Sequence, residues 1–134
     1  MSAKTYQFTK EERICSDRQI EKLFKEGASF INYPLRILWM ETDEGVDVPV
    51  KILVSVSKRK VHNAVDRNKV KRLIRESYRL NKAVLYDRMA ASGKCATIAF
   101  LWLSNEPGQF SRIAEKMHEA LEKIARQIEK KTTI

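Results

Sequence analysis

The chain of 134 residues has little cysteine, proline or glycine and no long apolar run. Cys15 and Cys95 lack both the density of a secreted disulfide scaffold and the paired spacing of a zinc site, so we interpret both as reduced thiols, with Cys95 in the core. Three prolines and four glycines are too few for a fibrous or disordered chain. The longest apolar run, 98–103, is far shorter than the roughly 18 residues of a membrane span. With no hydrophobic segment in residues 1–10, we predict a cytoplasmic protein with no membrane partner.

Residues for autonomous hydrolysis are also scarce. The two histidines, His62 and His118, are far apart in the sequence, and no acidic cluster suits two-metal chemistry. No Ser–His or Cys–His arrangement is recognisable from spacing. We therefore expect no catalytic residues and no metal ligands in the protein itself.

What the chain does have is positive charge, and the charge is localised. Lysine and arginine number 26 against 17 acidic residues, a formal net charge of +9. Residues 58–82 alone hold ten basic and two acidic side chains, a local net charge of +8 (10 − 2), while the remaining residues are nearly neutral. The ten basic residues are Lys58, Arg59, Lys60, Arg67, Lys69, Lys71, Arg72, Arg75, Arg79 and Lys82. The excess is therefore a site rather than a bulk property.

Three helices are predicted from apolar spacing. The first spans about 17–26, since Ser16 and Gln19 form a capping-box pattern and Gly27 is placed to end it. The second covers about 63–81, and the last follows the turn at 105–108 with a strongly amphipathic stripe.

Strands are predicted over 35–41, 48–56 and 95–103. The first two surround a turn at 43–45 and suggest an antiparallel hairpin or meander, which Pro49 could split into further strands. Residues 83–94 are interpreted as an irregular connection. The order predicts a single α+β domain over residues 1–134, with 1–10 as a flexible polar arm. We expect a two-layer α/β sandwich with one sheet of about four strands and three helices.

The second predicted helix carries a row of like charges. Arg67, Lys71, Arg75 and Arg79 recur every four residues, and each such pair costs an isolated helix about 0.2–0.5 kcal/mol. A solvated helix face is the ordinary explanation for a charge run, and a membrane-surface helix is another. The apolar stripe of this helix lacks the Trp or Phe of a lipid anchor. Ten bases to two acids, with arginine preferred in the row, favour a nucleic-acid partner.

The strand before this helix ends in a basic turn at 58–60. Ser55 and Ser57 would share one face of that strand, where a nucleic-acid backbone could approach closely, although each could equally be an ordinary exposed strand serine.

Three segments carry a resemblance to a known family. Residues 55–59 read SVSKR, 63–76 read NAVDRNKVKRLIRE, and 24–27 read FKEG. Together they make the chain, over roughly residues 10–125, resemble the protein subunit of bacterial ribonuclease P. The signature of that family is an Arg-Asn-Arg helix continued by Ile/Val-Lys-Arg.

The resemblance implies a fold similar to the second domain of ribosomal protein S5, with a left-handed βαβ crossover that the usual right-handed rule would not predict. It implies a partner, the ribonuclease P RNA subunit, and a substrate, precursor tRNA with its 5′ leader. The protein would assist endonucleolytic 5′ maturation of tRNA within the ribonucleoprotein, while the RNA performs the chemistry. Mg²⁺ would be held mainly by RNA and substrate, and no DNA partner is expected. The alternative is a ribosomal or other structural RNA-binding protein with no role in cleavage.

By matching positions, the resemblance implies two sets of residues. The leader cleft would contain Phe24, Ile20, Ser55 and Ser57, although Phe24 could instead be a core residue. Ile20 stands where the family often has a second aromatic, and Lys69 replaces the second Arg of the signature. The RNA-binding set comprises Lys58, Arg59, Lys60, Arg67, Asn68, Lys69, Lys71, Arg72, Arg75 and Arg79.

Overall fold

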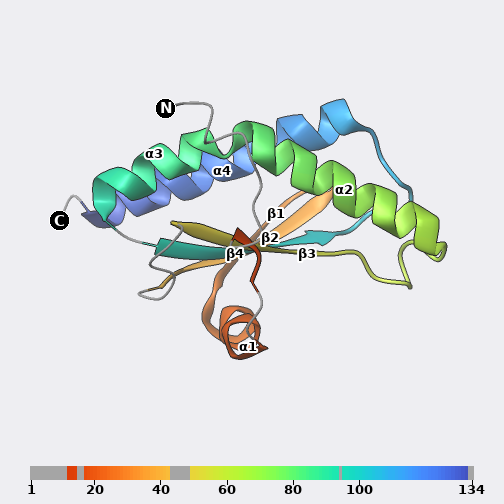
Figure 1. The fold of residues 1–134 in the computed structure, drawn as a ribbon, viewed down its shortest axis with the longest axis horizontal. Helices are drawn as coiled ribbons and strands as arrows, with labels where there is room; N and C mark the ends of the chain where they lie inside the picture. Colours follow the sequence, from red (N-terminus) through yellow and green to blue (C-terminus); the bar gives the residue numbers. More distant parts are fainter. Residues whose placement is uncertain (1–11, 15–16, 43–48, 94, 133–134) are drawn as a thin grey trace.

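The computed structural model describes residues 12–14, 17–42, 49–93 and 95–132. The elements follow in the order α1 (Asp17–Glu26), β1 (Ala28–Asn32), β2 (Leu35–Thr42), β3 (Val50–Ser55), α2 (Ala64–Asn81), α3 (Ala83–Ser92), β4 (Cys95–Trp102) and α4 (Phe110–Thr132), as Figure 1 shows. Four sequence predictions lie outside the described residues: the polar arm at 1–10, Cys15, the capping Ser16 and the turn at 43–45.

The four strands form one mixed sheet in the order β1-β2-β4-β3. β2 pairs antiparallel with both β1 and β4, and β3 pairs parallel with β4. The predicted α+β fold with one sheet of about four strands is therefore confirmed. The predicted hairpin between the second and third strands is wrong, because β4 lies between them. Residues 96–100 are all buried, and a strand covered on both faces takes the centre of a sheet.

The hairpin of this fold is formed by β1 and β2 instead. β1 was not predicted, because it is a short edge strand with Ile31 exposed and Phe30 only half-buried, which gives a weak alternating pattern. The turn between the two strands contains a cis peptide bond between Tyr33 and Pro34. Pro49 does not split a strand: β3 begins directly after it.

The helices at 17–26 and 63–81 and the C-terminal helix are confirmed. Residues 83–94, however, are not irregular, since α3 makes a fourth helix that ends at Gly93 with a positive φ of 70°. Its buried Leu85 and Met89 are four residues apart, which is too few positions to produce a clear stripe in the sequence.

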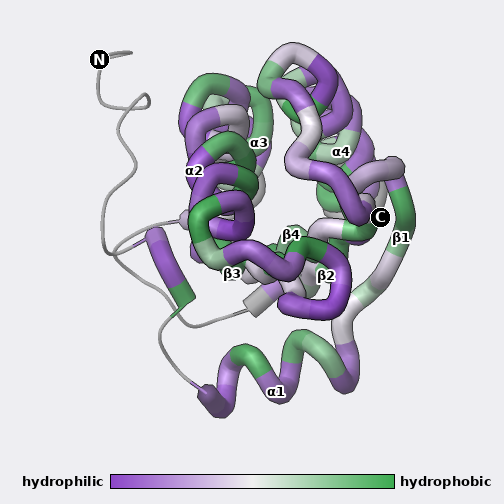
Figure 2. The backbone as a smooth tube through the Cα atoms, turned by 90° about the vertical axis from the view of Figure 1, so that its right-hand side faces the viewer, coloured by the Kyte–Doolittle hydropathy of each residue, from purple (hydrophilic) through white to green (hydrophobic). Residues whose placement is uncertain are grey.

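The two faces of the sheet are covered unequally (Figure 2). Helices α2, α3 and α4 lie over one face, and the main core between them contains Trp39, Ile98, Phe100 and Leu121. On the other face α1 lies alone, as Figure 2 shows at the bottom. The cluster beneath it is small, with Ile14, Leu23, Leu38 and Ala99 as its buried members.

α1 lies close to β2 because Gly27 ends it. A Cβ at this position would come within 2.5 Å of the Leu23 carbonyl oxygen and 3.2 Å of the Trp39 carbonyl oxygen. Cys95 is only half-buried at the start of β4, so its predicted place in the core is wrong. Within the described part of the chain, no helix is both long and apolar enough to cross a membrane.

Candidate nucleic-acid interface

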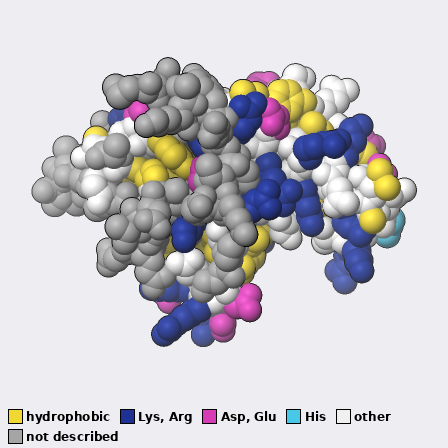
Figure 3. Space-filling view, viewed as in Figure 1, with side chains coloured by type: hydrophobic (Ala, Val, Ile, Leu, Met, Phe, Trp, Pro, Cys, Tyr) yellow, Lys and Arg dark blue, Asp and Glu magenta, His cyan; other side chains and the backbone are white. Residues whose placement is uncertain are grey.

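The basic row lies on α2, which the core holds by one side. Val70, Ile74 and Tyr78 are fully buried beneath the helix. The side chains of Lys69 and Arg72 are exposed, and Lys71 and Arg75 are half-buried. In Figure 3, lysine and arginine side chains gather over α2 and its surroundings. α2 thus combines a packed face with a cationic one.

The turn before α2 is built by the serine that was assigned to the cleft. Ser57 Oγ accepts a hydrogen bond from the Lys60 amide at 3.2 Å, and its carbonyl accepts one from the Val61 amide at 3.0 Å. Lys58 and Arg59 are exposed on this turn and Lys60 is half-buried. Ser57 therefore shapes the basic turn in addition to being exposed.

The first arginine of the row fastens this turn to the helix. Arg67 Nη1 donates to the carbonyl oxygens of Val61 and His62, at 3.1 and 2.8 Å. Asn63 caps the helix by accepting a hydrogen bond from the Val65 amide at 2.8 Å. Arg67 therefore fixes the angle between the basic turn and the basic helix as well as contributing charge.

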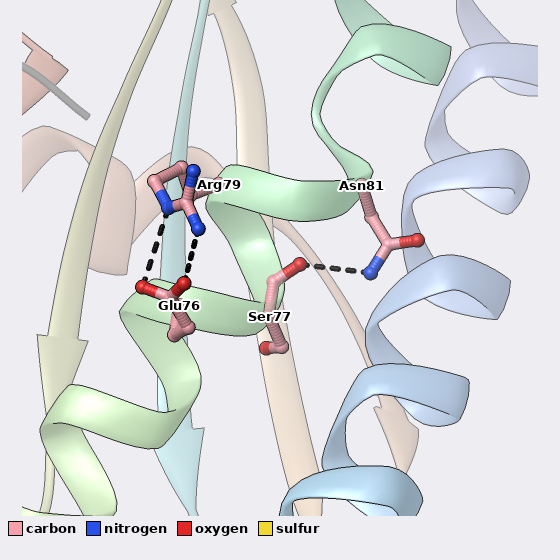
Figure 4. A network of polar contacts seen from close by, with 4 residues as sticks. All are labelled: Glu76, Ser77, Arg79 and Asn81. Carbon is pink, nitrogen blue, oxygen red and sulfur yellow. Dashed lines mark hydrogen bonds and ion pairs between the residues drawn. The ribbon is translucent and has the colours of Figure 1, made fainter. Parts of the chain in front are cut away.

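At the other end of the row, the charge is partly balanced (Figure 4). Arg79 forms an ion pair with Glu76, with its Nε 3.2 Å from Oε2. The hydrogen bond from Arg79 lowers the pKa of the Glu76 carboxyl. Asn81 nearby donates to the Ser77 carbonyl at 2.8 Å. The strongest uncompensated charge of the row therefore lies toward the beginning of α2.

One basic residue of the 58–82 segment is not on the surface at all. Lys82 is 1% exposed and its Nζ lies 2.8 Å from a carboxylate oxygen of Glu12. Sequence arithmetic counted it with the surface charge, whereas it is neutralised inside the protein.

The predicted cleft residues lie on the α1 side of the sheet. Ser55 is exposed and pairs in register with Leu101, which packs under α1. Phe24 on α1 is 48% exposed, so the alternative of a core residue is wrong. Ile20 is half-buried against the small cluster and supports α1. The structure thus places Phe24, Ile20 and Ser55 on one side of the sheet, but shows no contact among them.

Two further arginines belong to this surface and were not predicted. Arg36 is exposed on β2 opposite Leu101, and its Nε donates to Ser29 Oγ at 3.2 Å. Strand alternation in 35–41 was enough to place it on the α1 side. Arg13 lines a cavity with Arg75, and nothing in the sequence pattern signals that proximity. No three His, Cys, Asp or Glu side chains come together as a metal-binding group in the described ranges.

These features define a class: a basic α+β protein whose cationic helix and turn are presented beside a thinly covered sheet, as suits binding to a polyanion. Similar proteins narrow the class. The sequence model of the family described as Ribonuclease P matches residues 8–125. This chain belongs to the ribonuclease P protein family.

Individual relatives agree with this assignment. The ribonuclease P protein component of Porphyromonas gingivalis is 40% identical over 124 residues, covering 92% of this chain and 90% of the relative. That of Geotalea uraniireducens is 33% identical over 120 residues, covering 87% and 99%. The solved RNase P proteins of Staphylococcus aureus and Thermotoga maritima each match with a TM-score of 0.67, at 26% and 25% identity. These matches cover 86% and 84% of this chain, and 95% and 96% of the respective solved chains.

Proposed function

We propose that this chain binds the RNA subunit of ribonuclease P and the 5′ leader of precursor tRNA, and so assists removal of the leader. The observation that carries the proposal is the family match over residues 8–125, which includes the cationic helix α2. Arginine and lysine on one helix suit an RNA backbone because guanidinium groups bind phosphate through two parallel hydrogen bonds.

The two surfaces take different roles in this proposal. The RNA subunit contacts the basic turn and α2, through Lys58, Arg59, Lys60, Arg67, Asn68, Lys69, Lys71, Arg72, Arg75 and Arg79. The leader lies on the α1 side, where the exposed ring of Phe24 stacks on a base and the hydroxyl of Ser55 lets the strand approach the sheet.

The hydrolytic chemistry belongs to the RNA. Because the described residues offer no clustered carboxylate, imidazole or thiol donors, the Mg²⁺ ions of the reaction are held mainly by RNA and substrate. We place this activity in the cytoplasm, with no membrane or DNA partner.

Reconstitution tests the proposal directly. Precursor tRNA is incubated at low Mg²⁺ with a bacterial ribonuclease P RNA, with and without this protein. The protein should raise the rate of cleavage at the 5′ end of the mature tRNA and should cleave nothing without the RNA. Cleavage by the protein alone would refute the division of labour. Tight RNA binding without any stimulation would favour a structural RNA-binding protein instead.

A further inference from the structure

The basic segment and the beginning of the described chain are joined by a buried ion pair. Lys82 Nζ lies 3.0 and 2.8 Å from the two carboxylate oxygens of Glu12, 70 residues away in the sequence, and neither residue is more than 3% exposed. Tyr86 donates its hydroxyl hydrogen to the same carboxylate, and Lys82 Nζ lies 5.1 Å from the centroid of its ring. An apolar pair would stabilise a core at least as well, so stability alone does not explain this arrangement.

The position of Glu12 suggests what the pair does. The next residue, Arg13, forms a parallel bridge with Ile52 at the outer edge of β3, and the Ile14 amide donates to the Ile52 carbonyl at 3.0 Å. Ile14 is buried in the small cluster under α1. Arg13 is therefore held from both sides, through Glu12 at the helix layer and through Ile14 on the opposite face of the sheet.

Held in this way, Arg13 faces a second arginine. A cavity of about 180 Å³ is lined by both Arg13 and Arg75, with Ile14, Ile52, Leu53 and Val54 forming its apolar walls. Burial and the positive charge of Arg13 both lower the pKa of the Arg75 guanidinium. Two guanidinium groups beside one partly enclosed cavity repel each other unless an anion lies between them. A phosphate group fits that requirement in charge and in hydrogen-bonding geometry.

We propose that Glu12 and Lys82 are positioning residues, whose buried ion pair holds Arg13 beside Arg75 so that the two arginines together bind one phosphate of an RNA backbone. The inference rests on the proposed function for the identity of the anion. It adds Arg13 to the RNA-binding surface and gives the buried pair a task in binding. The phosphate belongs either to the RNA subunit or to the precursor tRNA.

Salt dependence provides the test, because each phosphate contact that is lost reduces the slope of log affinity against log salt by about 0.7–0.9. The slope is measured for the ribonuclease P RNA alone and for precursor tRNA binding to the reconstituted holoenzyme. Arg13→Gln should reduce the slope by one contact for one of these RNAs, and that RNA supplies the phosphate. Glu12→Ala combined with Lys82→Met removes both buried charges together and should cause the same reduction. Arg13→Gln added to that pair should cause no further reduction.

Controls separate positioning from folding. Arg126→Gln removes an exposed arginine of α4 and should leave both slopes unchanged. Melting temperature and amide NMR spectra establish that each variant is folded. If the double variant does not fold, Glu12→Gln keeps an oxygen for Lys82 and Tyr86 but removes the charge, and its slope should fall toward that of Arg13→Gln.

The possible results are distinct. A folded Glu12 and Lys82 variant with wild-type slopes for both RNAs overturns the positioning role. Unchanged slopes for Arg13→Gln overturn the two-arginine site. In both cases a wild-type protein that still binds and stimulates the RNA leaves the proposed function intact, whereas a wild-type protein that does neither refutes that function first.

Discussion

The two faces of the sheet solve different problems. Three helices cover one face and bury Phe100, Ile98 and Trp102 completely or nearly so. α1 alone covers the other, where Leu53 and Leu101 remain only partly buried and Phe24 is exposed. The thick side therefore supplies most of the apolar burial that stabilises the fold, while the thin side leaves aromatic, hydroxyl and cationic groups within reach of a ligand.

Helix α2 belongs to both regimes. Its buried residues are part of the thick core, and its cations continue the surface toward the thin side at the edge of β3. Because the core fixes the helix, its repelling cations remain aligned without a partner. If this division is right, substitutions on the two faces should separate stability from RNA binding.

The largest effect is expected at Phe100. Its ring is fully buried on the thick side, 6.0 Å from that of Tyr78 between centroids. Phe100→Ala should lower the free energy of unfolding by about 3–5 kcal/mol, measured by urea denaturation. Leu101→Ala, one residue further on the thin side, is the matched control and should cost less. An equal loss at both positions would contradict the division between the faces.

A smaller loss, with a pH signature, is expected at Tyr86. Burial above all, then the hydrogen bond to Glu12 and its charge, raise the pKa of the Tyr86 hydroxyl above its usual value near 10. The folded protein therefore keeps the proton, and the stability this provides is present below pH about 10 and is lost as the unfolded tyrosine ionises above it. Tyr86→Phe should cost about 1.5–3 kcal/mol near pH 7 through the lost hydrogen bond to a charged group. It should also make the alkaline decline of stability shallower, as thermal melts between pH 8 and 11 would reveal. A decline as steep as that of the wild type would exclude Tyr86 as its source.

On the thin side, Phe24 should affect binding and not stability. Phe24→Ala is expected to weaken precursor tRNA binding by about 1–3 kcal/mol, the value of one base stacked on an aromatic ring, at nearly unchanged affinity for the RNA subunit. The unfolding free energy should change by less than about 0.5 kcal/mol, as for other exposed positions. Phe24→Leu keeps an apolar side chain without the aromatic ring and should bind nearly as weakly. Equal losses for both RNAs would remove Phe24 from the leader cleft.

The smallest effect is expected at Arg72, which is exposed on α2. Arg72→Ala should reduce the salt slope for the RNA subunit by about 0.7–0.9 with unchanged stability. Arg67→Ala should reduce the slope similarly but also destabilise the protein, because Arg67 donates to two backbone carbonyls of the preceding turn. Arg126→Ala on α4 serves as the control with no change in slope. A wild-type slope for Arg72→Ala would exclude that residue from the interface.

Local patterns were sufficient to predict much of this fold. The apolar spacing of α1, α2 and α4 and the alternation of β2 and β3 are properties of neighbouring residues, so they can be read from one sequence. The place of β4 between β2 and β3 depends on pairing across the chain, which no local pattern contains. β1 and α3 were missed since an edge strand and a short helix with two buried residues bury little apolar surface of their own.

The candidate interface was predicted where charge is dense and missed where it is assembled by folding. The basic row and turn follow directly from the order of residues in 58–82. Arg13 meets Arg75 only because residues 12–14 align with the edge of β3. Lys82 was counted as surface charge, because its partner Glu12 is distant in sequence and adjacent only after folding.

The central position of β4 also has a consequence for the order of events on the ribosome. Translation releases α2 before β4, yet the sheet that α2 covers cannot close until β4 has entered between β2 and β3. The nascent chain therefore exposes a dense run of cations before it has a core in which to anchor them. An RNA that engages this segment early would relieve its self-repulsion, and assembly with RNA would then precede, rather than follow, completion of the fold.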